Sequence, residues 1–427
     1  MSTTNKKQNE KKESIALTRQ IYEYYRDHQK ECDKEYTIAM DPDISRIYEP
    51  IKEGMEKKEL VKISIVIITA NKFEKNILHQ CVYRITHSAI KEVDIILFDK
   101  PETHNTTNAY LFEWEGYSVL HIACQVTGSY TIGGCADAVR YCINNPYILP
   151  TAFISFGVCF GCQENESHLC DTVISKKVYP YFIGAKINGE QLRTLDDYRL
   201  EMSSEMQKKI QVFFDKNIIQ YNKLGFCVEY ENYITGEAVI SSRAARDLFV
   251  GITTQKIYAG DMEAYALFKE CNNAYWDIPC TVIKSICDWG ILKNVYNPEL
   301  YSEIMGQSGN KKEAELIKNK LQALAAYHSF QVLEILLKGI PNNKGNCDKP
   351  FEHSIYSRIR DKITGEKNEN TWDKCRLMKI AMELNQKLKN NITNDFIEVL
   401  CDNLAQELSM DNKENQITRK MKSSRKK

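Results

Sequence analysis

The 427-residue sequence has no net charge, because 57 Lys and Arg side chains balance 57 Asp and Glu side chains. This balance gives no bulk attraction to nucleic acid or to an anionic membrane surface. No apolar run approaches the roughly 20 residues that a membrane-spanning helix needs. The first thirteen residues are polar and Lys-rich, unlike a secretory signal peptide. We therefore expect a cytoplasmic protein that binds neither membranes nor nucleic acids.

The 15 cysteines lack the spacing of a metal site. Cys159 and Cys162 form a CxxC pair, but no second pair follows at zinc-ligand spacing. The glycines after residue 127 fit neither a phosphate-binding P-loop nor a dinucleotide fingerprint. We expect reduced thiols that pack in the core, with no metal and no cofactor.

The length fits either one large domain with appendages or two domains, and we place one α/β domain at residues 60–340, where strand and helix patterns alternate. Residues 1–59 read as a helical lead-in, disordered up to about residue 13, with a helix starting at Ser14. Residues 341–370 resemble a linker, and residues 371–427 predict a small helical appendage with a basic tail. Buried strands are predicted at 61–68, 93–98, 117–126, 151–161, 171–175 and 280–287.

Two acids stand at informative positions between Ala259 and Gly290. Glu263 opens a helical pattern, and Asp288 ends the short apolar strand that starts at Cys280. Each acid could simply cap a helix or a turn. Together they place two carboxylates near the carboxyl edge of a sheet, where open α/β sheets bind ligands.

This stretch resembles the purine nucleoside phosphorylase superfamily, and within it the methylthioadenosine/S-adenosylhomocysteine nucleosidase branch. The resemblance rests on Met262-Glu263-Ala264 and Cys287-Asp288, and six motifs in order extend it over about residues 60–338. It implies a three-layer nucleoside-phosphorylase-like fold: a twisted mixed central sheet flanked by helices, here with helical appendages at both ends. The run 283–289 looks more like the large bacterial effector-type members.

The resemblance implies cleavage of an N-glycosidic bond, which passes through an oxocarbenium-like sugar. Asp288 then has the role of a general acid that protonates the purine, and Glu74 that of the base that activates water. Glu263 would accept hydrogen bonds from the ribose hydroxyls. An alternative interpretation of Glu74 is an acid in the first turn of a helix, where it favours the helix dipole.

The same resemblance implies further substrate contacts and a choice of nucleophile. Phosphorylases hold phosphate with an Arg and a Ser where this sequence has Ser155 and Val158, which favours water. Val239 replaces an aromatic residue that stacks on the purine, so Phe160 or Trp289 could supply the stacking. The substrate contacts implied are Thr69, Gly128, Gly157, Val158, Cys159, Phe160, Val239, Ile240, Met262 and Lys284.

Four functions remain open from the sequence. The first is a hydrolytic nucleosidase that releases a purine from a nucleoside or nucleotide, and the second is a phosphate-dependent phosphorylase. The third is an effector of a defence system that cleaves ATP or a similar nucleotide, with Lys72, Lys75, Lys284 and Arg243 as cations near the site. The fourth is a non-enzymatic binding protein. By resemblance we also expect a homodimer or a higher homo-oligomer.

Overall fold

A computed structural model of the chain describes the following residues: 3–50, 61–63, 65–100, 103–124, 126–144, 148–150, 152–181, 187–188, 191–192, 199–201, 204–237, 240, 243–273, 278–290, 296–338, 340–341 and 347–348. The predicted appendage at 371–427, most of the predicted linker at 341–370, and Val239 lie outside these residues.

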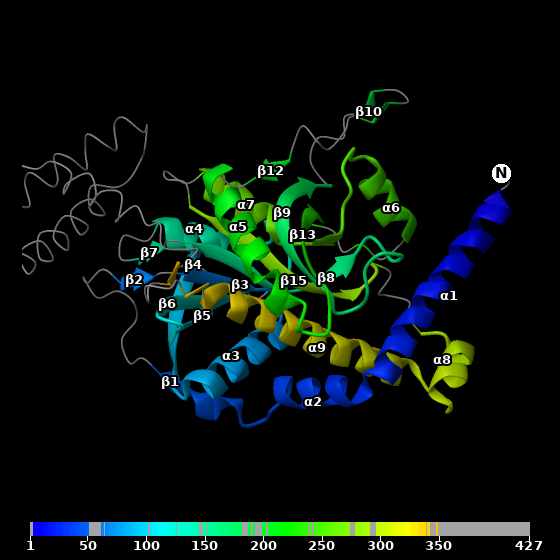
Figure 1. The fold of residues 1–427 in the computed structure, drawn as a ribbon, viewed down its shortest axis with the longest axis horizontal. Coiled ribbons are helices and arrows are strands. Elements are labelled where there is room, and N and C mark those ends of the chain that lie inside the picture. Colours follow the sequence, from blue (N-terminus) through cyan, green and yellow to red (C-terminus); the bar gives the residue numbers. More distant parts are fainter. Residues whose placement is uncertain are drawn as a thin grey trace, which may run out of the picture.

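A mixed sheet of 11 strands forms the centre of the described structure (Figure 1). Its middle strands are buried on both faces, as expected for strands covered by helices on both sides. The order of the strands is β1 (Tyr48–Pro50), β4 (Ile90–Lys100), β5 (Thr103–Trp114), β6 (Tyr117–Ala123), β3 (Ile65–Thr69), β8 (Phe153–Gly161), β14 (Ala259–Asp261), β13 (Val228–Thr235), β9 (Thr172–Pro180) and β12 (Leu200–Glu201), while β15 (Cys280–Asp288) pairs with both β8 and β9.

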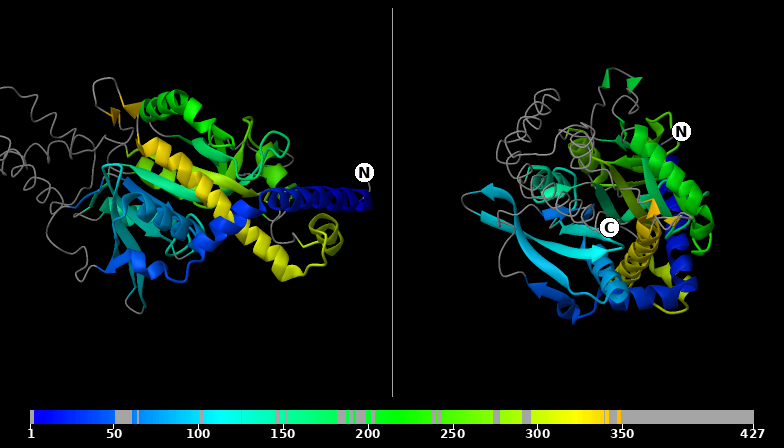
Figure 2. Two further views of the ribbon diagram at one scale, coloured as in Figure 1. Left: turned by 60° about the horizontal axis from the view of Figure 1, so that its bottom comes forward. Right: turned by 60° about the vertical axis from the view of Figure 1, so that its left-hand side comes forward.

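Helices cover the sheet on both sides (Figure 2). Successive side chains of β15 point to opposite faces of the sheet. Ser285 is hydrogen-bonded to Ser329 of α9 on one face, and the neighbouring Lys284 is hydrogen-bonded to Glu263, at the start of α7, on the other. The helices are α1 (Thr3–Asp27), α2 (Gln29–Ala39), α3 (Lys72–Thr86), α4 (Cys135–Asn144), α5 (Ser204–Tyr221), α6 (Arg243–Gly251), α7 (Ala264–Asn273), α8 (Pro298–Met305) and α9 (Lys311–Lys338).

The remaining described elements are short. They are the 3-10 helix η1 (Ile44–Ile47) and the strand pairs β2 (Val61–Ile63) with β7 (Ile148–Pro150), β10 (Ile187–Asn188) with β11 (Gln191–Leu192), and β16 (Ile340–Pro341) with β17 (Cys347–Asp348). The strand predicted at 61–68 is therefore two strands, β2 and β3, which join different sheets. None of the helices in the described part of the chain has the length and apolar character needed to cross a membrane.

The N-terminal segment differs from its prediction in two ways. Helix α1 begins at Thr3, not at Ser14, because the Lys, Gln and Glu residues before Ser14 are good helix formers. The segment also packs with the central sheet, which its prediction as a helical lead-in did not include. Strand β1 extends the central sheet by pairing in parallel with β4, and Leu17, Ile21 and Cys32 belong to the same hydrophobic core as the sheet.

Candidate active site

A cavity of about 170 Å³ lies at the edge of the sheet where β3, β8 and β15 end. The predicted residues that line it are Glu74, Val158, Cys159, Phe160, Ile240, Met262, Glu263 and Asp288. Residues that the sequence analysis did not assign also line it: Ala70, Asn71, Thr127, Gly260, Asp261, Cys287 and Gln322. Three acids predicted from separate parts of the sequence therefore share one cavity.

Glu74 enters this cavity from the first turn of α3, where it is part of a capping box with Asn71. Its Oε2 accepts hydrogen bonds from the backbone N–H groups of Ala70, at 2.7 Å, and Asn71, at 3.1 Å. Its Oε1 accepts a third from the N–H of Val158, at 2.9 Å. The two interpretations of Glu74 are therefore compatible, because the helix-capping carboxylate is also the one that faces the cavity.

Gly157 makes this position of Glu74 possible. Its φ is +144°, in a region that favours glycine, and a Cβ atom at this position would overlap the Glu74 carboxyl group. Gly157 itself is not among the residues that line the cavity. The predicted substrate contact by Gly157 does not fit this position. A glycine is needed here because the backbone lies against the Glu74 carboxyl group.

The environment of Glu74 has opposing electrostatic contributions. Burial raises the pKa of its carboxyl group to about 7. The positive charge of Lys284 and the N–H groups of Val158 and Ala70 act against this rise, while the negative charge of Glu263 adds to it. Glu74 therefore titrates near neutral pH, where a general base has to exchange protons.

Asp288 ends β15, lines the same cavity and is also buried. Its Oδ1 accepts a hydrogen bond of 2.6 Å from the N–H of Gly290, and the Cys287 thiol lies 3.4 Å from Oδ2. Burial raises the pKa of Asp288 to about 6, against the effect of the Gly290 hydrogen bond. A carboxyl group with this pKa can carry and donate a proton near neutral pH.

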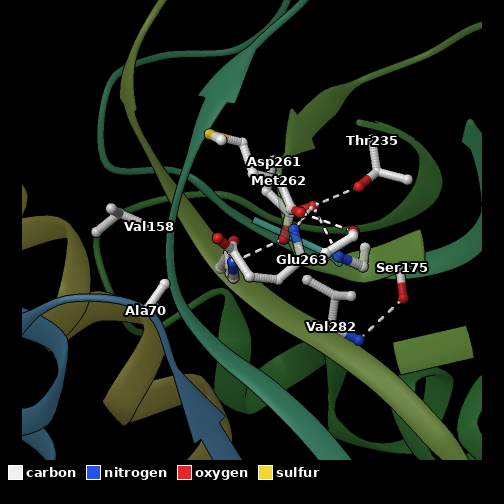
Figure 3. A network of polar contacts seen from close by, with 12 residues as sticks. Ala70, Val158, Ser175, Thr235, Asp261, Met262, Glu263 and Val282 are labelled. Atoms are coloured by element: carbon white, nitrogen blue, oxygen red, sulfur yellow. Dashed lines mark hydrogen bonds and ion pairs between the residues drawn. The ribbon is translucent and has the colours of Figure 1, made fainter. Parts of the chain in front are cut away.

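Glu263 is held by a buried ion triad (Figure 3). The Lys284 ammonium group lies 2.6 Å from Asp261 Oδ2 and 2.7 Å from Glu263 Oε2. Burial alone would lower the pKa of Lys284, but the two carboxylates outweigh it and hold that pKa well above its usual value. Lys284 therefore stays charged and holds Glu263 in place. It was predicted to contact the substrate, but it is not among the residues that line the cavity.

Asp261 was missed from the sequence, although it stands only two residues before Glu263. Its Oδ1 accepts hydrogen bonds from the Thr235 hydroxyl and from the N–H groups of Glu263 and Ala264 (Figure 3). It thus caps the N-terminus of α7 and fixes the backbone that carries Glu263. A sequence signal existed, because an acid beside a helix start is a typical cap.

Two other predicted contacts support the site rather than line it. The N–H of Gly128 donates to Glu263 Oε1 at 3.1 Å, so the glycine loop acts on the acid. The hydroxyl of Thr69 is bonded to His121 Nε2 at 2.9 Å, and Thr69 is not among the lining residues. Direct substrate contact by Thr69 does not fit this position, since the strand end turns its side chain toward β6.

The aromatic wall of the cavity is Phe160, next to Ile240. Trp289, the other candidate for stacking, is buried and packs against Gly161 instead. Within the residues that the structure describes, no group of three or more His, Cys, Asp or Glu side chains is arranged to hold a metal ion.

No protein-family model and no curated protein matches the chain. Among solved structures it is similar to a putative 5′-methylthioadenosine/S-adenosylhomocysteine nucleosidase from Borrelia burgdorferi B31 bound to adenine, with 18% identity over 64% of this chain and 98% of that chain and a TM-score of 0.46. The 5′-methylthioadenosine/S-adenosylhomocysteine nucleosidase from Neisseria meningitidis in complex with methylthio-immucillin-A is 15% identical over 64% of this chain and 98% of that chain, with a TM-score of 0.45. Futalosine hydrolase of Helicobacter pylori is 12% identical over 65% of this chain and 97% of that chain, with a TM-score of 0.45.

Proposed function

We propose that the protein is an enzyme that hydrolyses the N-glycosidic bond of a purine nucleoside or nucleotide, as the sequence resemblance implies. The observation that carries the proposal is the placement of three buried carboxylates, Glu74, Glu263 and Asp288, around one cavity with the aromatic ring of Phe160. Each carboxylate has a different set of partners, and each set suits a different step of the reaction.

In this mechanism Asp288 and Glu74 move the two protons. Asp288 gives its proton to N7 of the purine, and the electron pair of the C1′–N9 bond leaves with the base. Glu74 takes a proton from water as the water oxygen forms the new bond to C1′. The products are the free base and a sugar with a C1′ hydroxyl, and the proton of Glu74 then restores Asp288 through solvent.

Glu263 is suited to hold the ribose because its own position is already fixed. Its Oε1 accepts from Gly128 and its Oε2 from Lys284, at 3.1 and 2.7 Å. Each carboxylate oxygen has a second lone pair, so the group can still accept hydrogen bonds from two sugar hydroxyls. A sugar held in this way would present C1′ to the water beside Glu74.

Water is favoured over phosphate as the nucleophile by the partners of Glu74. The N–H groups of Ala70, Asn71 and Val158 form the kind of donor cluster that binds an anion. All three donate to the Glu74 carboxylate. A phosphate would have to displace these bonds and approach a buried negative charge, which costs several kcal/mol at such distances.

The test is release of free base by the purified full-length protein. Adenosine, methylthioadenosine, AMP and ATP are each incubated with and without phosphate, and the products are separated by chromatography. We expect base release without phosphate and no ribose 1-phosphate product. Release that depends on phosphate would establish a phosphorylase instead, and no release from any purine substrate would contradict the proposal.

A nucleotide is the second candidate substrate, and one feature of α9 favours it. Gln322 lines the cavity, and Lys318 lies one helical turn before it on the same face. The charge of Lys318 lowers the pKa of Asp288, which also lines the cavity. Among the described residues, Lys318 makes no hydrogen bond or ion pair, whereas Arg243 and Lys284 are both paired with carboxylates.

The Lys318→Met variant tests this second candidate. If Lys318 binds a substrate phosphate, kcat/KM for AMP or ATP falls about 10- to 100-fold more than kcat/KM for adenosine, the range for a lost charged hydrogen bond. Lys312→Met, an exposed lysine on the same helix, is the matched control. An equal loss with adenosine and AMP would remove the argument for a nucleotide.

A further inference from the structure

Four side chains form a continuous hydrogen-bonded chain beneath the proposed active site. Tyr48 Oη lies 2.9 Å from His79 Nδ1, His79 Nε2 lies 2.7 Å from His121 Nδ1, and His121 Nε2 lies 2.9 Å from Thr69 Oγ1. The four residues come from β1, α3, β6 and β3 (Figure 1). His79, His121 and Thr69 are buried, and Tyr48 is half-buried.

The two histidines in this chain are neutral. Burial lowers the pKa of His121 to about 3 and that of His79 well below its usual value, and the nearby charge of Lys75 acts in the same direction. A neutral imidazole has one N–H and one acceptor nitrogen. The two hydroxyl groups and the two neutral imidazole rings each carry one hydrogen, so each of the three hydrogen bonds has a donor and an acceptor. The protonation of the four groups does not change across the neutral pH range.

The chain lies on the face of α3 that meets the N-terminal segment. Asn76 Nδ2 donates to the carbonyl of Ala39 at 2.7 Å, and Gln80 Nε2 donates to Asp41 at 3.0 Å. Together with His79, these residues have the i, i+3 and i+4 spacing of one helix face. Residues 39–48 therefore hold α3 by directed hydrogen bonds as well as by apolar packing.

Two members of the hydrogen-bonded chain, Thr69 and His79, lie on either side of the turn that carries Glu74. Thr69 is the last residue of β3, and His79 lies in the second turn of α3. Between them are the N–H groups of Ala70 and Asn71, which bind Glu74, and Glu74 itself. The chain thus fixes the strand end and the helix on either side of the proposed base.

We propose that Tyr48, His79 and His121 are positioning residues, which hold Glu74 against the N–H of Val158 and so make the N-terminal segment part of the active site. The inference rests on the proposed function, since it assigns the chain to the water-activating group. None of the three residues lines the cavity, so they act through Thr69 and α3.

The first test is Tyr48→Phe, compared with Tyr25→Phe as a matched control. Tyr25 also belongs to the N-terminal segment and loses a hydroxyl with two partners, Asp33 and Lys320, but it does not bond α3. We expect Tyr48→Phe to lower kcat about 10-fold with KM nearly unchanged, below the about 100-fold that a 1 Å misplacement can cost. Tyr25→Phe should leave kcat unchanged.

The pH profile separates positioning from a purely structural role. Glu74 faces Lys284, Glu263 and the Val158 N–H, and the N–H and the lysine both lower its pKa. Loosening Glu74 changes its burial, which has the largest influence on its pKa, together with these contacts, so the pKa of Glu74 and the alkaline limb of the profile shift in Tyr48→Phe. A variant that is only less stable keeps the wild-type profile, and that result would overturn the proposal.

A double variant tests whether the chain itself transmits the effect. Thr69→Val breaks the chain at its other end, and Tyr48 and Thr69 are joined through the two histidines. If the chain acts as a unit, the double variant is about as slow as the worse single variant. Multiplying effects would mean that the two ends act independently, which contradicts the proposal.

Hydrogen–deuterium exchange gives a readout that does not need activity. We expect faster exchange in peptides covering residues 70–75 in Tyr48→Phe and Thr69→Val, and wild-type exchange there in Tyr25→Phe. If wild type releases no base but this exchange pattern appears, the chain still positions Glu74 and the proposed function has failed. Unchanged exchange in both chain variants overturns the positioning role.

Discussion

Glu74 and Asp288 are both buried acids with raised pKa values, but the groups around them differ. Glu74 accepts three backbone N–H bonds, whereas Asp288 accepts one and has a thiol beside its other oxygen. Three N–H donors at one carboxyl group suit the ionised form, which is acceptor only. One donor leaves an oxygen of Asp288 that can carry a proton. The number of donors therefore supports Glu74 as base and Asp288 as acid.

If Glu74 and Asp288 have the proposed roles, their pKa values imply that the reaction starts from a minor ionisation state. With Glu74 at about 7 and Asp288 at about 6, the favoured singly protonated form has its proton on Glu74. The form needed for catalysis, with Asp288 protonated and Glu74 ionised, is about tenfold rarer. We therefore expect a bell-shaped dependence of kcat/KM on pH, with its maximum between the two values.

The largest effect is expected from Asp288→Asn. The amide keeps the acceptor for the Gly290 N–H but cannot give a proton to the purine. We expect base release to fall by about 10³-fold or more, within the range for a lost general acid. Chromatography of released base measures the rate, and circular dichroism checks the fold. A fully active Asp288→Asn enzyme would exclude Asp288 as the acid.

Glu74→Gln is the matching change on the other acid, and we expect it to slow hydrolysis about 10²-fold. The informative result is the shape of the pH profile. Without Glu74, the alkaline limb reports Asp288 alone and moves from about pH 7 to about pH 6. If that limb stays in place, the order of the two pKa values is the reverse of the one described here.

Local patterns together with the family resemblance were sufficient to select the three acids that line one cavity. Glu74 follows a strand and opens a helix, Glu263 opens a helix, and Asp288 ends a strand, so each acid could be located from its own segment. Parallel strands bring such ends to one edge, as β3, β8 and β15 do here. The general form of the α/β sheet was predictable for the same reason.

Contacts between distant segments could not be predicted. His79 and His121 stand on a helix and a strand 42 residues apart, and neither has a local signal. The pairing of Lys284 with Asp261 also depends on which face of β15 meets α7. Oligomeric state and cellular location remain predictions, because neither follows from the contacts within one chain.

Two glycines allow a further test of the difference between Glu74 and Asp288, because each has a positive φ and lies beside one of these acids. A methyl group at Gly157 would overlap Glu74, whereas one at Gly290 would meet its nearest atom, in Ile240, at 3.3 Å. We expect Gly157→Ala to lower kcat about 10²-fold by displacing Glu74, and Gly290→Ala to cost about tenfold less than that. Equal losses would show that backbone strain, and not the position of Glu74, causes the effect.

The last prediction compares the acids by stability. An acid whose pKa is higher in the folded chain opposes folding once it ionises, so the contribution of Asp288 falls as pH rises from about 4 to about 6. Asp288→Asn removes this loss and keeps the Gly290 bond. We expect it to be more stable than wild type by about 2–3 kcal/mol at pH 8 and equal to it near pH 4, by urea unfolding.

Glu74→Gln should not show the same gain, although the pKa of Glu74 is raised as well. Its three N–H donors would face an amide that has a single acceptor oxygen, so at least one buried donor loses its partner, at a cost of about 1–3 kcal/mol. This cost offsets what is gained by removing the buried charge. An equal gain in stability in both variants would mean that the N–H donors do little to hold Glu74. The two acids would then differ only in their proposed roles in the reaction.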